Sequence, residues 1–123
     1  MNIDWPRYHP IFQPHEFTCK CGCGLLNISP AMVDKLFIAR GIAGIPFHIS
    51  SACRCPKHNA SVTAAKDSAH PDGLAADIRA TNMISRHAIL KSLFAVGFPR
   101  IGIASWGFHA DICSRRPQGV FFY

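Results

Sequence analysis

The segment Ser68–Ile78, with the sequence SAHPDGLAADI, joins a loop histidine to an aspartate that lies seven residues further along the chain. Its first half is rich in turn-forming residues, which places His70 in a loop. Residues 74–79 then alternate between apolar and other side chains, a period of two that predicts a strand. Asp77 falls on the face of that strand opposite to its aliphatic side chains.

A second segment, Gly107–Ile112, has the sequence GFHADI and predicts another strand. Alternation places its apolar side chains on one face and points His109 and Asp111 together to the other. If the two strands are neighbours, Asp77 and His109 meet on one face of the sheet. The loop would then carry His70 over them.

Two imidazoles and one carboxylate, from His70, Asp77 and His109, form the ligand set of a catalytic zinc ion with one open position for water. Zinc lowers the pKa of bound water to about 7 and polarises a carbonyl oxygen, as amide hydrolysis requires. A single histidine is more often a surface or hydrogen-bonded residue, and this is our interpretation of His9, His15, His48, His58 and His87. The combination of two histidines with an aspartate on alternating strands favours a metal site.

The rest of the chain predicts a single α+β domain over residues 1–123, a small, mostly antiparallel sheet with helices packed on one side. A helix should begin after Ser29, a preferred N-cap residue followed by proline, and end at Gly41. The other predicted elements are a short helix at 57–65, a helix at 85–96, and strands at 45–50, 74–79, 100–104, 107–113 and 119–123. Residues 1–18 contain three prolines and are predicted to form an irregular N-terminal arm.

The composition is that of a folded protein, because 49% of the 123 residues are hydrophobic and 16% are charged. The formal net charge of +6 favours anionic partners in general. The basic residues are scattered along the chain, and only Arg115 and Arg116 are adjacent. The sequence therefore predicts no nucleic-acid-binding arm.

The first residues of the chain have neither a basic head nor an apolar run, and nowhere do about 18 apolar residues follow one another. We therefore expect cytoplasmic synthesis without a signal peptide, and no insertion into a membrane. A target outside the membrane would require that the protein be exported or released.

At these residues the sequence resembles the zinc peptidase family of D-Ala-D-Ala carboxypeptidases and L-alanyl-D-glutamate endopeptidases, which includes phage endolysins. The family pattern, Ser-x-His-x-x-Gly-x-Ala-x-Asp followed by a later histidine, is matched by Ser68, His70, Gly73, Ala75, Asp77 and His109. An upstream Ser-x-x-Arg is present as Ser51–Arg54, and the turn Cys19–Gly24 is typical of the short phage and prophage branch. The resemblance spans about residues 16–113.

The resemblance implies that His70, Asp77 and His109 are the zinc ligands. It also implies that Arg54 binds the carboxylate of the substrate or the oxyanion that forms at the attacked carbonyl. A guanidinium suits either task, because it is always charged and bonds two oxygens at once.

The identity of the general base is left open by the sequence. Larger family members commonly carry a glutamate three residues before the second histidine, and here that position is Trp106. Asp111 acts either as the general base or as a carboxylate that orients a ligand imidazole, and Asp72 is a more distant candidate. Trp106 and Ser68 are expected near the substrate, Trp106 as a wall of the cleft and Ser68 within the loop of His70.

These features predict a zinc metallopeptidase, a hydrolase that cleaves peptide bonds in the stem peptides of bacterial peptidoglycan. It would act as a monomer, either as a D-Ala-D-Ala carboxypeptidase or as a stem-peptide endopeptidase of the endolysin kind, and a phage or prophage origin fits. Because the usual glutamate is missing, the alternative is an inactive module that holds zinc and binds other molecules, as the hedgehog signalling domain does. A nucleic-acid-binding zinc protein is a further alternative, against which the scattered basic residues argue.

Six cysteines lie in three groups along the chain: Cys19, Cys21 and Cys23, then Cys53 and Cys55, and finally Cys113. Disulfides between the groups, a second zinc held by thiolates, and free thiols are the alternatives. Cys-x-Cys lacks the two-residue gap of ordinary zinc ribbons, which argues against the second zinc.

Overall fold

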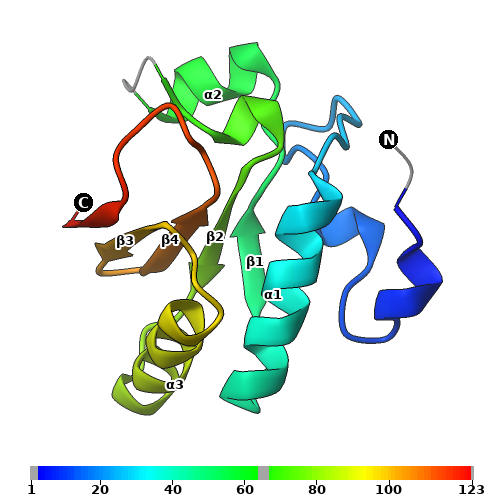
Figure 1. Cartoon of the computed structure of the whole chain (residues 1–123). Helices are drawn as coiled ribbons and strands as arrows, with labels where there is room; N and C mark the ends of the chain where they lie inside the picture. The colour runs from blue at the N-terminus through cyan, green and yellow to red at the C-terminus, as the bar shows by residue number, and fades with distance from the viewer. Residues whose placement is uncertain (1–2, 64–66, 123) are drawn as a thin grey trace.

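A five-stranded sheet in the order β1-β2-β4-β3-β5 lies at the centre of the computed structural model, which describes residues 3–63 and 67–122 (Figure 1). The strands are β1 (His48–Ser51), β2 (Ala75–Arg79), β3 (Arg100–Ala104), β4 (Gly107–Asp111) and β5 (Gly119–Phe122). The first four in this order pair antiparallel, and β5 runs parallel to β3 at the edge. The predicted α+β fold with a mostly antiparallel sheet is confirmed.

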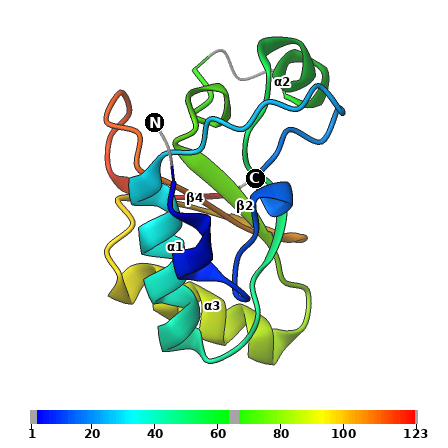
Figure 2. The ribbon, with the colours of Figure 1, turned by 90° about the vertical axis from the view of Figure 1, so that its right-hand side faces the viewer.

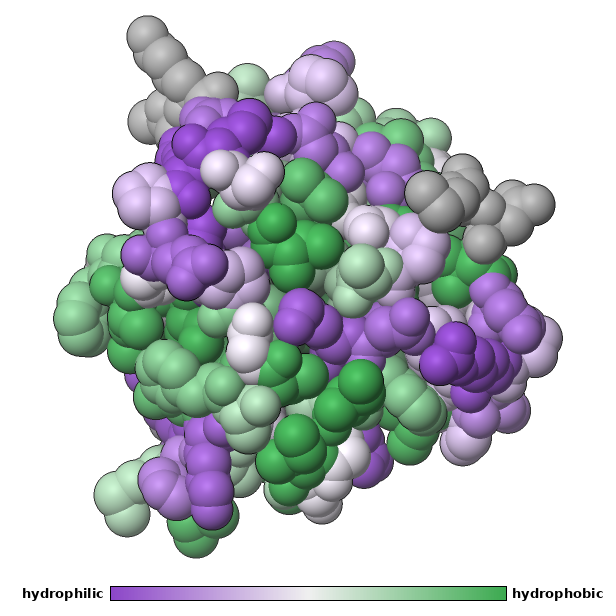
Figure 3. Space-filling view, viewed as in Figure 1, coloured by the Kyte–Doolittle hydropathy of each residue, from purple (hydrophilic) through white to green (hydrophobic). Residues whose placement is uncertain are grey.

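Helices α1 (Pro30–Ala43) and α3 (Met83–Ala95) pack together on one face of the sheet (Figures 1 and 2). The apolar face of the sheet meets these helices in a core that includes Met32, Val33, Leu36, Ile78, Leu93, Ile101 and Phe108. On the outside of this helical layer, hydrophobic and hydrophilic side chains are mixed (Figure 3). Because strand side chains alternate, the other face of the sheet carries the polar residues of β2 and β4.

Local capping explains where the helices begin and end. Ser29 caps α1 as predicted, because its hydroxyl oxygen accepts a hydrogen bond from a backbone N–H of the first turn. The predicted end at Gly41 is wrong: the helix passes through Gly41, and the left-handed residue that terminates it is Gly44. α3 begins before the predicted Ser85, because the Asn82 side chain accepts a hydrogen bond from the Ser85 N–H.

Several further elements differ from the prediction at their ends; β2, for example, starts at Ala75 instead of residue 74. β1 starts at His48 instead of residue 45, beyond Pro46, and β4 ends at Asp111 instead of residue 113. The short helix α2 spans Pro56–Val62. The end of the predicted helix 57–65 and the last residue of the predicted strand 119–123 lie outside the described residues.

The N-terminal arm contributes to the core although it has little regular structure. Its described part contains two 3-10 helices, η1 (Trp5–Tyr8) and η2 (Pro14–Glu16). Phe12 and Phe17 are buried, with ring centroids 5.4 Å apart. The Phe17 carbonyl accepts a hydrogen bond from the Cys53 N–H at 3.0 Å, which fastens the arm to the loop after β1.

A close backbone contact fixes the loop that leads into β2. The short helix η3 (His70–Asp72) ends at Gly73, which has a φ of 70°. A Cβ atom at this position would lie 2.0 Å from the carbonyl oxygen of Asn27, so a side chain does not fit. The Gly73 carbonyl also accepts a hydrogen bond from the Ser29 N–H at 2.8 Å. The start of α1 therefore holds η3 in place.

Replacement of Gly73 by alanine should lower the free energy of unfolding by at least roughly 1–3 kcal/mol, the usual cost of a left-handed non-glycine residue. Denaturant unfolding measures this change. Gly41→Ala is the matched control: no atom lies within 4 Å of its added Cβ, and alanine in a helix interior should raise stability by roughly 0.5–1 kcal/mol. Equal effects of the two substitutions would contradict the left-handed conformation and close contact of Gly73.

Candidate metal centre

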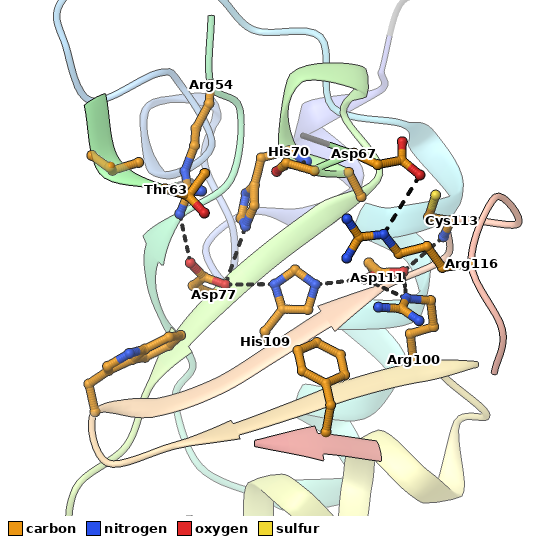
Figure 4. A pocket seen from close by; sticks show the side chains of 15 residues that line it. Arg54, Thr63, Asp67, His70, Asp77, Arg100, His109, Asp111, Cys113 and Arg116 are labelled. Atoms are coloured by element: carbon orange, nitrogen blue, oxygen red, sulfur yellow. Dashed lines mark hydrogen bonds and ion pairs between the residues drawn. The ribbon is translucent and has the colours of Figure 1, made fainter. Parts of the chain in front are cut away.

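Asp77 on β2 and His109 on β4 are directly opposite each other in the sheet. His109 Nδ1 lies 3.0 Å from Asp77 Oδ1 (Figure 4). Their chain neighbours Ile78 and Phe108 belong to the core beneath the helices, so both polar side chains lie on the opposite face. The juxtaposition expected from the alternation of the two strands is therefore present.

The loop before β2 brings a second imidazole to the same carboxylate. His70 belongs to η3, and its Nε2 lies 3.4 Å from Asp77 Oδ1. The possible ligand atoms of His70, Asp77 and His109 all lie within 4.8 Å of one another. The three residues are only 2–6% exposed. The three predicted metal-ligating residues thus converge in a buried group.

A backbone carbonyl orients His70. Its Nδ1–H donates a hydrogen bond to the carbonyl oxygen of Ala52 at 2.7 Å. A carbonyl oxygen can only accept, so the proton of the neutral ring lies on Nδ1 and the lone pair of Nε2 faces Asp77. The His70 backbone N–H also donates to the hydroxyl oxygen of Ser68 at 3.3 Å, as expected for a residue within this loop.

A second carboxylate orients His109 from the side opposite to Asp77. His109 Nε2 lies 2.6 Å from Asp111 Oδ2 and donates its proton there. Asp111 is fixed in turn by the Arg100 guanidinium at 3.2 Å and by the Cys113 backbone N–H at 3.0 Å. When the His109 ring is neutral with its proton on Nε2, its Nδ1 turns a lone pair toward Asp77.

When both rings are neutral, two nitrogen lone pairs face one carboxylate oxygen, an arrangement that a cation between them would stabilise. Burial opposes the charge on Asp77, but hydrogen bonds with His109 and His70 outweigh it and hold the pKa of the carboxyl below its usual range. Burial also opposes protonation of His109, yet its hydrogen bonds with Asp111 and Asp77 raise its pKa. A divalent cation between these atoms would replace the proton that the raised pKa of His109 favours. Two nitrogen donors and one oxygen donor fit zinc.

A cavity of about 370 Å³ opens over the group. It is lined by the predicted residues Arg54, Ser68 and Trp106, and also by Thr63, Arg116 and Phe121. Three arginines and three aspartates surround it, so the cavity has both cationic and anionic walls. An open, charged cavity above the buried candidate ligands suits a polar substrate.

Some predicted and observed site residues differ. Asp72 does not reach the cavity, because its exposed carboxylate pairs with Arg115 at 2.8 Å. Sequence reasoning missed Arg100, which lies beside Asp111 in the pairing of β3 with β4. An alignment of the two predicted strands in this register would have placed Arg100 beside Asp111. The carbonyl of Ala52 leaves no signal in the sequence, because it acts through its backbone.

Zinc binding to the metal-free protein should release protons near neutral pH, because His109 must lose the proton that its raised pKa favours. Replacement of Asp111 by asparagine removes one carboxylate from His109, so it should lower this proton release and weaken zinc binding by about 10–100-fold. Titration calorimetry in two buffers of different ionisation enthalpy measures both. Asp72→Asn, the same change outside the cavity, is the control; equal behaviour of the two variants would contradict the role of Asp111.

A model of the Peptidase M15 family matches residues 10–111, which is most of the chain and includes the whole candidate metal centre. No curated protein matches the sequence. Peptidases of this family are zinc-dependent, and the buried His-Asp-His group is a candidate site for that metal. The chain therefore belongs to the Peptidase M15 family.

Proposed function

We propose that this protein is a zinc metallopeptidase that hydrolyses peptide bonds in the stem peptides of bacterial peptidoglycan. The observation that carries the proposal is the convergence of His70, Asp77 and His109, buried at the base of a charged cavity, in a chain of this family. Cleavage of the terminal D-Ala-D-Ala bond and cleavage of an internal stem-peptide bond are both compatible with it.

The three residues would hold the ion through His70 Nε2, Asp77 Oδ1 and His109 Nδ1. When bound, zinc supplies a Lewis acid that polarises the scissile carbonyl and makes a water molecule nucleophilic near neutral pH. The carbonyl of Ala52 and the carboxylate of Asp111 orient the two imidazoles so that His70 Nε2 and His109 Nδ1 face Asp77.

Arg54 is proposed to bind the negative charge of the substrate. Its Nη2 donates to Asp77 Oδ2 at 3.0 Å and its Nε donates to Ser51 Oγ at 2.9 Å, so the guanidinium is held at the cavity wall. A fixed guanidinium stabilises an anion without the cost of reorganisation. Either the substrate carboxylate or the oxyanion of the attacked carbonyl fits this position.

Of the two roles considered for Asp111, its contacts favour the orienting one. The carboxylate is buried and bonds His109, Arg100 and the Cys113 N–H. Burial opposes its charge, but the hydrogen bond with His109 and the nearby cations outweigh burial and lower its pKa. A carboxyl with a lowered pKa is a poor proton acceptor near neutral pH, whereas it holds an imidazole well.

The cavity walls suit a short peptide with a free carboxylate. The ring of Phe121 lies 5.7 Å from that of His109, and Trp106 lines the same cavity. Arg116 adds a cation near the rim. A volume of about 370 Å³ is at the small end of ligand sites and matches a substrate of few, small residues. We propose that Ser68 and Trp106 contact this peptide.

Among the described residues no helix is long and apolar enough to cross a bilayer. We propose that the protein acts on the cell wall as a monomer once it is exported or released, as a phage or prophage product would be.

One observation favours a second candidate function, a zinc-holding module that binds the cell wall without cutting it. The position three residues before His109 is Trp106 instead of glutamate, and the carboxylate of Asp111 is already occupied by its partners. A peptidoglycan digestion assay distinguishes this function from hydrolysis.

His109→Ala should lower the rate of peptidoglycan digestion by more than about 100-fold, since loss of a ligand costs more than loss of a residue that orients one. His87→Ala, an exposed histidine on α3, is the control and should leave digestion unchanged. Mass spectrometry of the fragments identifies the cleaved bond. Binding to cell wall without cleavage would support the second candidate, and digestion by His109→Ala would contradict the metallopeptidase proposal.

Arg54→Lys should retain zinc but lower kcat/KM by about 100–1,000-fold, the usual cost of losing an oxyanion donor. Lysine keeps the charge and loses the planar, two-oxygen geometry of arginine. Arg79→Lys, an exposed site on β2, is the matched control. Steady-state kinetics and metal analysis of the same preparations test this prediction. Unchanged kinetics in Arg54→Lys would remove Arg54 from the substrate site.

A further inference from the structure

Four of the six cysteines gather in a second group that shares no residue with the His-Asp-His group. The turn after η2 brings three of them beside the N-terminal end of α2, where the fourth lies (Figures 1 and 2). Their sulfur atoms all lie within 4.8 Å of one another. These four, named here the thiol cluster, are Cys19, Cys21, Cys23 and Cys55.

The sulfur spacings within the thiol cluster match those around a metal ion. Cys21 Sγ lies 3.5 Å from Cys19 Sγ and 3.7 Å from Cys55 Sγ. In a tetrahedral site with Zn–S bonds of about 2.3 Å, neighbouring sulfur atoms stand about 3.8 Å apart. A disulfide would need sulfur atoms about 2.05 Å apart, and all four cysteines are free. The spacing therefore favours an ion over a covalent bridge.

The backbone of the turn is shaped to present alternate residues to one centre. Gly22 lies between Cys21 and Cys23, and Gly24 follows Cys23. Their φ angles are 89° and 83°. These left-handed residues curl the chain, and the Cys19 N–H closes the turn by donating to the Leu25 carbonyl at 2.9 Å. In an extended chain, Cys-x-Cys side chains would also share a face, but they would not wrap around a point. Because of this turn, the cysteines can surround one ion although Cys-x-Cys is not the spacing of ordinary zinc ribbons.

Backbone N–H groups also point at the sulfur atoms. The Cys55 N–H donates to Cys19 Sγ at 3.4 Å, and the His58 N–H donates to Cys55 Sγ at 3.4 Å. Such bonds favour the charged thiolate, which is the form of cysteine that binds metals.

We propose that the thiol cluster is a second metal site, in which four thiolates bind one structural zinc ion. Four sulfur ligands leave no open position, which is the property of a structural zinc site. Thiolates select zinc over magnesium, calcium and manganese, which prefer oxygen. The site shares no ligand with His70, Asp77 and His109, so its occupancy can be measured separately from the proposed peptidase activity.

The second ion would fasten the segment that supports the first. Residues 52–55 follow β1: Ala52 accepts the hydrogen bond of His70, Arg54 bonds Asp77, and Cys55 belongs to the thiol cluster. Cross-linking Cys55 to the turn anchors this segment at its far end. The ion would therefore position residues of the catalytic cavity without touching the substrate.

The test counts metal ions on the full chain, purified under reducing conditions. Elemental analysis should find two zinc ions per chain in the wild type and one in Cys21→Ser, whose exposed side chain adds little to the core. His109→Ala should lose the other ion and keep this one. Cys53→Ala is the control: it removes a buried thiol outside the thiol cluster, from the loop that carries Cys55, and should keep both ions.

Cobalt substitution identifies the ligands without relying on any one variant. Cobalt-loaded wild type and His109→Ala should both show the near-ultraviolet charge-transfer absorption of cobalt bound to thiolates, and Cys21→Ser should lose most of it. Bound cobalt without this absorption in the wild type would overturn the proposal, as would a disulfide among the four cysteines in non-reduced peptide maps. Loss of peptidase activity without loss of the cobalt–thiolate absorption would argue against the metallopeptidase proposal and not against the thiol cluster. The two proposals can therefore be contradicted separately.

Discussion

Two buried carboxylates, Asp77 and Asp111, face the single imidazole of His109 from opposite sides. Neutral imidazole donates one proton, so it satisfies one of them and leaves a lone pair against the other. The pairing of β2 with β4 fixes the positions of Asp77 and His109 in the backbone. A second proton or a metal ion on the imidazole is needed to satisfy both carboxylates, which is why we propose that the site binds a cation.

The surrounding structure serves to hold this group. The loop after β1 supplies a carbonyl from Ala52 for one imidazole and the guanidinium of Arg54 for the free oxygen of Asp77. That loop is fastened in turn by Phe17 in the N-terminal arm and, under our proposal, by a metal ion at Cys55. The arm is therefore part of the support of the site, which agrees with a family match that begins at residue 10.

The sequence predicts the features of the site that depend on local residue patterns, and it does not predict those that depend on backbone contacts or strand register. Strand alternation gave the shared face of Asp77 and His109, because period two is a direct property of extended chain. Helix ends were less certain, since a glycine such as Gly41 is tolerated inside a helix that tertiary packing stabilises. The support from Ala52 is a backbone contact, and Arg100 depends on strand register. The thiol cluster depends on the left-handed glycines of a turn. The Ala52 contact, the position of Arg100 and the thiol cluster are therefore not visible in residue spacing alone.

The most direct test of the central claim is a crystal structure of zinc-loaded protein with anomalous diffraction measured on both sides of the zinc absorption edge. The account predicts a strong anomalous peak bonded to His70, Asp77 and His109, with Asp111 still hydrogen-bonded to the far nitrogen of His109. An anomalous map with no peak there, and imidazoles that keep ordinary hydrogen bonds at saturating zinc, would contradict it.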